Sequence, residues 1–286
     1  MEVICKCCGG DVRSALKLKV LGKYEEDLLV CNKCEFLFFD KPFWLDEAYK
    51  QPINIYDTGI LQRNISNSKF LSLFLNLFFD GNIECLDYAG GYGIFTRLMR
   101  DLGIEYYWVD PYTTNLVARG FEHDEKKRYT LLTAFEFLEH SVEPLRDIER
   151  MAKLSENIVI STLIKSSNVP NPEWWYYGKE HGQHVSFYSI RALEIIAKKI
   201  GKILISDGMS LHFFLDEKYV NNSVKIFVEE KKIIGWSILK KIKKIHNISL
   251  INVLKMVFGQ LKVEDVGIEK AKSLTMSDHL YLVNKN

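Results

Sequence analysis

From residue 84 onward, short apolar runs alternate with amphipathic stretches along the chain. Five apolar runs have the length and composition of buried strands, and they lie at 84–89, 104–110, 128–135, 157–163 and 202–208. Three stretches carry apolar residues at helical spacing, at 94–103, 142–154 and 191–201. Strands that alternate with helices predict an α/β fold with a parallel sheet covered on both faces. Ligands of such sheets bind beyond the carboxyl ends of the strands.

The pattern changes at both ends of this predicted core. In residues 1–45, two short strands are expected at 16–22 and 27–30, and 46–80 is expected to form a helical segment that leads into a core at 81–215. After it, 216–275 alternates apolar and lysine positions at helical spacing, which predicts a basic helical insertion. Residues 276–286 alternate as a strand does, so we expect them to form the final strand of the sheet.

Composition narrows the class of protein. The 286 residues carry 38 Lys+Arg against 37 Asp+Glu and are 47% hydrophobic, which supports a buried core and argues against a disordered chain. The most apolar stretch, 70–79, is only ten residues long and is too short to span a bilayer. The first residues lack the apolar run of a secretory signal, so the predicted location is the cytoplasm.

Five of the six cysteines lie in the first 34 residues. Two C-x-x-C pairs, Cys5 with Cys8 and Cys31 with Cys34, offer the four sulfur ligands that tetrahedral zinc prefers. Cys7 is an alternative ligand, but the two glycines after Cys8 favour the outer pair. We therefore expect a small zinc ribbon whose metal stabilises it and whose closed site is remote from any chemistry. Disulfides are disfavoured in a cytoplasmic chain.

The segment after the first core strand is rich in glycine. It reads Asp87-Tyr88-Ala89-Gly90-Gly91-Tyr92-Gly93 and leads into a helix, so a ligand can approach the backbone closely beside a helix amino terminus. Asp110 ends the second strand and can accept hydrogen bonds from ribose hydroxyls. NAD and S-adenosylmethionine both fit this arrangement. A dinucleotide fingerprint starting at Gly91 fails, because Thr96 replaces its third glycine.

The motifs DYAGGYG, WVDPY and TAFEFLEH together resemble the core of class I S-adenosylmethionine-dependent methyltransferases. With WLDEAY, DTGILQRN and EWWYYGKEHGQHVSFYS, the chain is similar to a bacterial group associated with surface-glycan and modified-sugar biosynthesis. The resemblance implies a Rossmann-like sheet. It also implies that residues border the cofactor as follows: Asp87, Ala89, Gly90 and Gly91 at the methionine part, Asp110 at the ribose and Phe135 nearby. Ala89 departs from the family, which has a glycine there.

A cluster of acid and imidazole groups follows the predicted third core strand. Glu136, Glu139 and His140 have the spacing of one helical face. The E-x-x-E-H sequence resembles the metal site of small-RNA 2′-O-methyltransferases and of ubiquinone-type catechol methyltransferases. That resemblance implies a divalent cation, such as Mg²⁺, that holds two adjacent oxygens of the acceptor. The alternative is that Glu139 buttresses the sheet edge and that His140 packs beneath the cofactor.

A second cluster lies in the loop after the next strand. His184 is the candidate general base, because imidazole titrates near neutral pH, and His181 is expected to orient it or to bind substrate. The preceding run 174–177, WWYY, forms either an aromatic platform for a sugar or part of the core. Asp57, Arg63 and Asn64 are expected to form a surface network or to close over the cofactor.

Together these features predict methyl transfer to a sugar hydroxyl, on a small-molecule or lipid-linked sugar. Residues 225–262 carry nine lysines and two glutamates, which favours a solvated basic face and permits contact with an anionic membrane surface. Nucleic acid is a less favoured partner. The alternatives are a metal-assisted RNA 2′-O-methyltransferase, a keto-sugar C-methyltransferase, and a non-catalytic binding module that the substitution at Ala89 would support.

Overall fold

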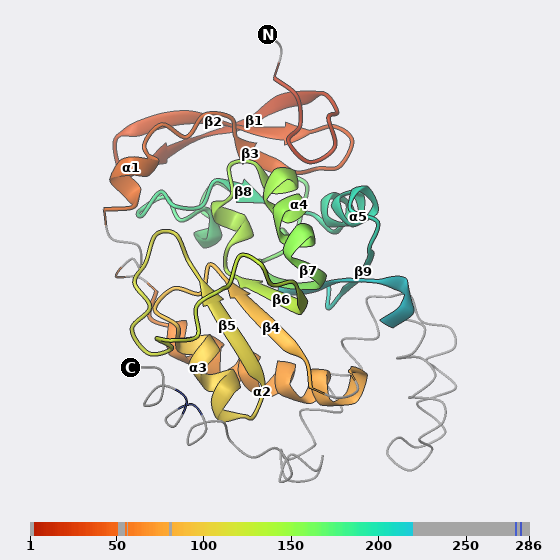
Figure 1. Cartoon of the computed structure of the whole chain (residues 1–286). Helices are drawn as coiled ribbons and strands as arrows, with labels where there is room; N and C mark the ends of the chain where they lie inside the picture. The colour runs from red at the N-terminus through yellow and green to blue at the C-terminus, as the bar shows by residue number, and fades with distance from the viewer. Residues whose placement is uncertain are drawn as a thin grey trace, which may run out of the picture.

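The computed structural model describes residues 3–50, 55, 57–79, 82–219, 278 and 281. Two β-sheets organise this part of the chain, and helices lie on both faces of the larger one (Figure 1). The predicted basic insertion at 216–275, including the lysine-rich 225–262, lies outside the described residues except for 216–219.

The larger sheet has six strands in the order β5-β4-β6-β7-β10-β9. Its members are β4 (Glu84–Tyr88), β5 (Glu105–Val109), β6 (Tyr129–Phe135), β7 (Ser155–Ser161), β9 (Ile203–Ser206) and β10 (Leu211–Leu215). The four strands β5, β4, β6 and β7 are parallel to one another, whereas β10 is antiparallel to both β7 and β9. The α/β fold with a mainly parallel sheet is thus confirmed, because each apolar run found in the sequence is a buried strand.

Helices cover the two faces of this sheet through separate apolar clusters. On one face lie α2 (Ile60–Phe78) and α3 (Ile94–Asp101), whose Leu71, Phe74 and Met99 pack on strand residues such as Val159. On the other face lie α4 (Pro144–Leu154) and α5 (Ile190–Lys199). Pro144 begins α4, and the Ser189 hydroxyl caps α5 by accepting a hydrogen bond from the backbone N–H of Ala192.

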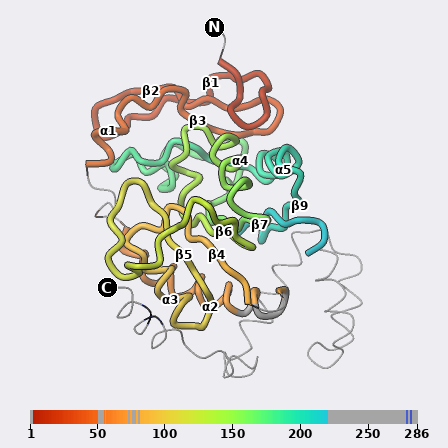
Figure 2. The backbone as a smooth tube through the Cα atoms, in the orientation of Figure 1, coloured from red at the N-terminus to blue at the C-terminus, as the bar shows by residue number. Residues whose placement is uncertain are grey.

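The smaller sheet contains the amino-terminal strands and one strand from the core. Its order is β1 (Val12–Val20), β2 (Tyr24–Cys31), β3 (Leu37–Phe39) and β8 (Ser186–Phe187), all antiparallel, and α1 (Leu45–Ala48) follows β3. The chain therefore returns to the amino-terminal sheet after building most of the core, as the backbone trace shows (Figure 2). The predicted ribbon at 1–45 is not a closed unit, because its sheet is completed by β8.

The carboxyl-terminal end of the sheet differs from the prediction. Within the described residues the last strand of the sheet is β10, which follows β9 after a turn in which Asp207 Oδ1 accepts three backbone N–H bonds. All five residues of β10 are buried, since the strand lies between two neighbours and under a helix layer. The two described residues of 276–286, Asp278 and Tyr281, are helical, so the predicted final strand is wrong there.

No helix in the described part of the chain is both long enough and apolar enough to cross a membrane.

Candidate active site

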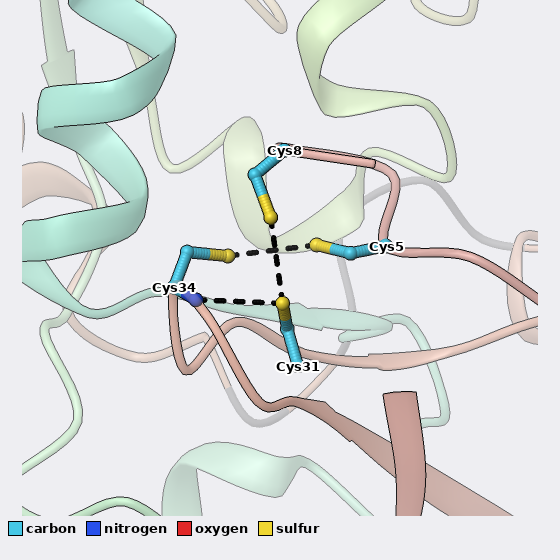
Figure 3. A group of neighbouring side chains, drawn as sticks. All are labelled: Cys5, Cys8, Cys31 and Cys34. Carbon is cyan, nitrogen blue, oxygen red and sulfur yellow. Dashed lines mark hydrogen bonds between the residues drawn. The ribbon is translucent and has the colours of Figure 1, made fainter. Parts of the chain in front are cut away.

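The four predicted zinc ligands converge at one point. The sulfur atoms of Cys5, Cys8, Cys31 and Cys34 lie within 4.8 Å of one another, with Cys5 facing Cys34 at 3.5 Å and Cys8 facing Cys31 at 3.4 Å (Figure 3). Backbone N–H groups of Lys33 and Cys34 point at the Cys31 sulfur. All six cysteines are free thiols, and the donor set matches a tetrahedral four-cysteine zinc site.

Cys7 is not one of the four converging cysteines. It is fully buried, and burial raises the pKa of its thiol well above the usual value. Inside the group, the hydrogen bond between Cys5 and Cys34 lowers the pKa of Cys5 and raises that of Cys34. The spacing argument that favours the outer cysteines therefore agrees with the geometry.

The glycine loop after β4 has the backbone angles of a tight crossover. Gly91 and Gly93 have φ of 54° and 85°, and Ala89 shares this left-handed region with φ of 56°. A Cβ on Gly90 would lie 2.7 Å from Trp108 Cδ1 and 2.8 Å from Asp87 Oδ2, so only glycine fits there. The loop is therefore packed tightly from beneath.

Asp87 lies under this loop. Both of its oxygens accept hydrogen bonds from threonine hydroxyls, Oδ2 from Thr96 at 3.0 Å and Oδ1 from Thr133 at 3.2 Å. Burial raises the pKa of Asp87 to about 7, against the opposing effect of the two threonines. In this geometry Asp87 connects β4 with α3 and β6, and it supports the loop from within.

Asp110 joins the loop to the end of β5. Its Oδ2 accepts a hydrogen bond from the N–H of Gly91 at 2.9 Å, and its Oδ1 accepts from the N–H groups of Tyr112 and Thr113. Because a carboxylate has about four acceptor positions, one remains on Oδ2 for a ribose hydroxyl. Thr113 also donates to the carbonyl of Gly91. The predicted cofactor residues after β4 and β5 are thus brought together.

Two further predicted residues end β6. Phe135 packs edge-to-face on Phe95, with ring centroids 4.9 Å apart. Glu136 has φ of 51° and is therefore not helical, and its carboxylate binds the Ser161 hydroxyl and lies 3.7 Å from Arg63 Nε. The expectation that Glu136 shares one helical face with Glu139 and His140 is wrong, because the chain turns at Glu136.

The network predicted before the core reaches this edge. Arg63 donates to Asp57 Oδ1 at 2.6 Å, in addition to its contact with Glu136. The Asn64 side chain donates to the carbonyl of Ile60 within α2. Arg63 therefore connects the start of α2 with the end of β6.

Glu139, His140 and His184 form a second group of potential ligands, with ligand atoms within 4.8 Å of one another. The first two lie on the short helix η1 (Leu138–His140), and His184 precedes β8. Glu139 is 0% exposed; its Oε1 accepts from the Tyr176 hydroxyl at 2.8 Å, while Oε2 has no hydrogen-bond partner among the described residues. Burial, reinforced by the charge of Glu136, raises the pKa of Glu139 to about 8.

The two histidines of this group are held through the same ring nitrogen. His184 Nδ1 lies 2.7 Å from the carbonyl of Tyr176, and His140 Nδ1 lies 3.1 Å from the carbonyl of Gln183. A carbonyl only accepts, so both Nδ1 atoms carry the proton and both Nε2 atoms are left as acceptors. Burial lowers the pKa of His140 to about 4 and that of His184 well below its usual value, so both rings are neutral at pH 7.

His181 has the opposite tautomer. Its Nδ1 accepts a hydrogen bond from the backbone N–H of Gln183 at 3.1 Å, so the proton resides on Nε2. Its ring stacks edge-on against that of His184, 4.8 Å between centroids, and lies directly over Gly178. His181 therefore packs beside His184 and offers no lone pair on Nε2.

The aromatic run 174–177 divides into core and surface. Tyr176 and Tyr177 are buried and Trp174 is half-buried, as the core interpretation predicts. Trp175, on the helix η2 (Trp175–Tyr177), is 73% exposed. Only Trp175 among these four is open enough to stack on a ligand.

Two aromatic residues of the amino-terminal segment were not predicted as part of the site. The Tyr49 hydroxyl lies 2.9 Å from His140 Nδ1, and Trp44 Nε1 donates to the carbonyl of Gly182 at 2.8 Å. Both belong to the WLDEAY motif, and its aromatic residues were the only available signal. These contacts connect residues 44–49 to His140 and to the segment that precedes His184.

Comparison with known proteins identifies the central region. A family model described as a methyltransferase domain matches residues 61–204. The chain is similar in fold to magnesium protoporphyrin IX methyltransferase from Synechocystis PCC 6803, with 13% identity over 61% of this chain and 91% of that chain and a TM-score of 0.41. An O-methyltransferase family protein from Burkholderia thailandensis is 15% identical, over 62% of this chain and 68% of that chain, with a TM-score of 0.40. The plantazolicin methyltransferase BpumL is 12% identical, over 65% of this chain and 87% of that chain, with a TM-score of 0.43. No curated protein matches the chain.

Proposed function

The chain is a methyltransferase of the methyltransferase domain family, and on that premise we propose that it transfers the methyl group of S-adenosylmethionine to a sugar hydroxyl. The observation that carries the choice of a hydroxyl acceptor is Oε2 of Glu139, which has no hydrogen-bond partner in the described part of the chain and lies with His140 and His184 in one group. Glu139 and His140 follow β6, the strand beside the glycine-loop strand β4.

S-adenosylmethionine supplies a methyl group that is already activated on a sulfonium. The glycine loop at 89–93 allows close approach of its methionine part, and the free acceptor position of Asp110 suits a ribose hydroxyl. Phe135 lies at the same edge of the sheet. Transfer joins the acceptor oxygen to the methyl carbon as the carbon–sulfur bond breaks, and the hydroxyl proton passes to water.

The group of Glu139, His140 and His184 fits a divalent cation. Each histidine fixes its Nδ1–H on a backbone carbonyl and leaves Nε2 as an acceptor, which is the arrangement found around metal-bound histidines. Two nitrogens and one carboxylate suit a first-row ion such as Mn²⁺ or Zn²⁺ better than Mg²⁺, which prefers oxygen ligands. A bound cation would lower the pKa of a coordinated hydroxyl. His184 then acts as a ligand, and its depressed pKa makes it a weak general base.

A sugar acceptor agrees with two features of this edge. A cation with open positions can hold the two adjacent oxygens of a vicinal diol. The exposed indole of Trp175 adjoins Tyr176, whose hydroxyl binds Glu139, so an aromatic face lies next to the group. The same diol argument applies to the terminal ribose of RNA, which makes 2′-O-methylation the second candidate.

At the four cysteines we propose a structural Zn²⁺. The sulfurs already lie within 4.8 Å of one another, and backbone N–H groups point at the Cys31 sulfur. The ion would close the two C-x-x-C turns and stabilise the amino-terminal sheet.

Glu139→Gln tests the proposed function. The amide keeps the size of the side chain and an acceptor for Tyr176 but cannot ionise to the carboxylate that a cation needs as ligand, so we expect methyl transfer to fall more than about 100-fold with the affinity for S-adenosylmethionine unchanged. The assay measures S-adenosylhomocysteine release with Mn²⁺, using nucleotide sugars and short RNAs as acceptors. Glu173→Gln, on the exposed surface, is the matched control.

Each result of this assay has a defined meaning. Transfer to sugars that is lost in the variant supports the proposal, and transfer only to RNA assigns the second candidate. An active Glu139→Gln variant would remove the group from the mechanism.

A further inference from the structure

The segment that carries His184 is held from the amino-terminal side. We use the term cysteine module for residues 3–50. Besides the bond from Trp44 to the carbonyl of Gly182, the Gln183 side chain donates to the carbonyl of Ala48 at 2.9 Å. The backbone N–H of Phe39 donates to the carbonyl of Val185 at 3.1 Å. Hydrogen bonds with Trp44, α1 and β3 thus hold this segment at residues 182, 183 and 185.

The same segment is held from the core side. The N–H of Val185 donates to the carbonyl of Glu139 at 2.7 Å, and the Ser186 hydroxyl donates to the carbonyl of Ser141 at 2.6 Å. Residues 185–186 therefore bridge β3 of the cysteine module and η1 of the core. His184 directly precedes this bridge, so its distance from Glu139 and His140 depends on both sides.

The cysteine cluster fixes the position of β3. The N–H of Cys31 donates to the carbonyl of Phe36 at 2.9 Å, and Cys34 lies three residues before Leu37, the first residue of β3. From the other side, the Ser189 hydroxyl donates to the carbonyl of Cys34 at 2.6 Å while it caps α5. One short turn thus connects the cluster to β3, and one hydrogen bond connects it to the end of the His184 segment.

The part of the site that faces the cofactor, the glycine loop after β4, is held by other contacts. Gly90 bonds to Val109, and Gly91 bonds to Trp108, Asp110 and Thr113. All of these lie in the region 84–113 of the large sheet and its loops. The contacts that shape the glycine loop therefore do not pass through the cysteine module.

We propose that the cysteine module is a positioning element of the acceptor site. Zinc at the four cysteines fixes β3 and residues 44–49, and through them places His140 and His184 against Glu139, with Trp44 and Tyr49 as the positioning residues. Loss of the ion disorganises the acceptor half of the site and leaves the cofactor half in place. This proposal rests on the proposed function, which assigns Glu139, His140 and His184 to the acceptor.

The experiment compares zinc-loaded full-length protein with zinc-stripped protein and with Cys31→Ser. Histidine ¹⁵N NMR reports the tautomer of each ring, and signals are assigned by single histidine substitutions. With zinc, His140 and His184 are expected as Nδ1–H tautomers. Without zinc, both are expected to shift to the mixture of free histidine, while the Kd for S-adenosylmethionine, measured by calorimetry, changes less than about threefold.

Two side-chain variants test the route without touching the cysteines. Tyr49→Phe removes only the hydroxyl beside His140 and is expected to shift the His140 signals. Trp44→Phe removes the N–H that holds Gly182 and is expected to shift the His184 signals. Tyr24→Phe, in the same module, loses a bond to Glu47 and is expected to leave both unchanged.

Two outcomes would overturn the inference. One is unchanged His140 and His184 signals in zinc-free protein; the other is loss of S-adenosylmethionine binding in parallel, which indicates that the whole chain unfolds. The NMR readout needs neither acceptor nor second cation. Failure to find a methylated acceptor, with the expected tautomer changes present, would therefore count against the proposed function alone.

Discussion

Two residues at the candidate site, Ala89 and Glu136, hold left-handed backbone angles that glycine adopts more easily. Both directly follow a strand of the parallel sheet, β4 and β6. The surrounding structure maintains them: Glu136 bonds through its N–H and its carboxylate to Ser161, and the loop after Ala89 is held by Asp110. Such strain gathers where a loop is shaped for a ligand.

Ala89→Gly is expected to stabilise the protein by about 1 kcal/mol, because glycine removes the left-handed penalty of the methyl group. Urea unfolding of zinc-loaded protein measures the change. Ala152→Gly, within α4, is the matched control and is expected to destabilise by about 1 kcal/mol. A lower midpoint for Ala89→Gly would show that the loop depends on the methyl group.

Asp87 gives a pH dependence with a definite sign. Its pKa is raised to about 7 in the folded protein from 3.8, so between these values the folded state binds more protons than the unfolded state. Its contribution to the free energy of unfolding therefore falls as pH rises from about 4 to 7, by up to about 1.4 kcal/mol per pH unit. It does not change further above pH 7.

Asp87→Asn removes this titration. We expect the variant to gain stability relative to wild type as pH rises across that window, as measured by urea unfolding at several pH values. A constant difference between the two proteins from pH 4.5 to 7.5 would contradict the assignment.

At the scale of elements, the crossover from β4 to α3 depends on close packing beneath Gly90. Gly90→Ala would place a methyl group against Trp108 and Asp87, so we expect a loss of about 1–3 kcal/mol in stability and at least tenfold weaker S-adenosylmethionine binding. Calorimetry and urea unfolding measure the two effects. Gly201→Ala, where a Cβ meets open space but φ of 66° disfavours alanine, is the control for cofactor binding: it should also lose stability and leave cofactor affinity unchanged.

Most elements of the large sheet were predictable, because each apolar run between 84 and 208 is bounded by polar or glycine residues. The strand β10 was missed, since its five residues are buried on both faces and lack the alternation that 276–286 displays. The cysteine pairs and the glycine loop could be predicted because the residues of each motif are close in sequence. The contacts of Tyr49 with His140 and of Trp44 with Gly182 could not be predicted, because they join residues far apart in the chain. The prediction that Glu136 shares a helical face with Glu139 failed because the backbone turns at Glu136 instead of forming a helix there.

For the whole molecule, the two sheets share one apolar core. The cysteine-bearing turns and Phe38 belong to the same buried cluster as Leu132 of β6 and Ile158 of β7. The proposed zinc ion would therefore stabilise the face of β6 and β7 on which the small sheet packs, as well as the small sheet itself. The amino-terminal segment therefore acts as one wall of the catalytic domain, and a truncation at residue 50 would expose the apolar face of the core.

The pairing of β3 with β8 also has a consequence for the order of events during synthesis. Residues 37–39 leave the ribosome early, but their partners at 186–187 follow only after most of the core has been made. Until then β3 has an unpaired edge, which invites pairing with other chains. Early capture of zinc by the four cysteines would hold β1, β2 and β3 in a compact hairpin during this interval. Metal supply during translation would then determine the yield of folded enzyme, in addition to its effect on the acceptor site of the folded protein.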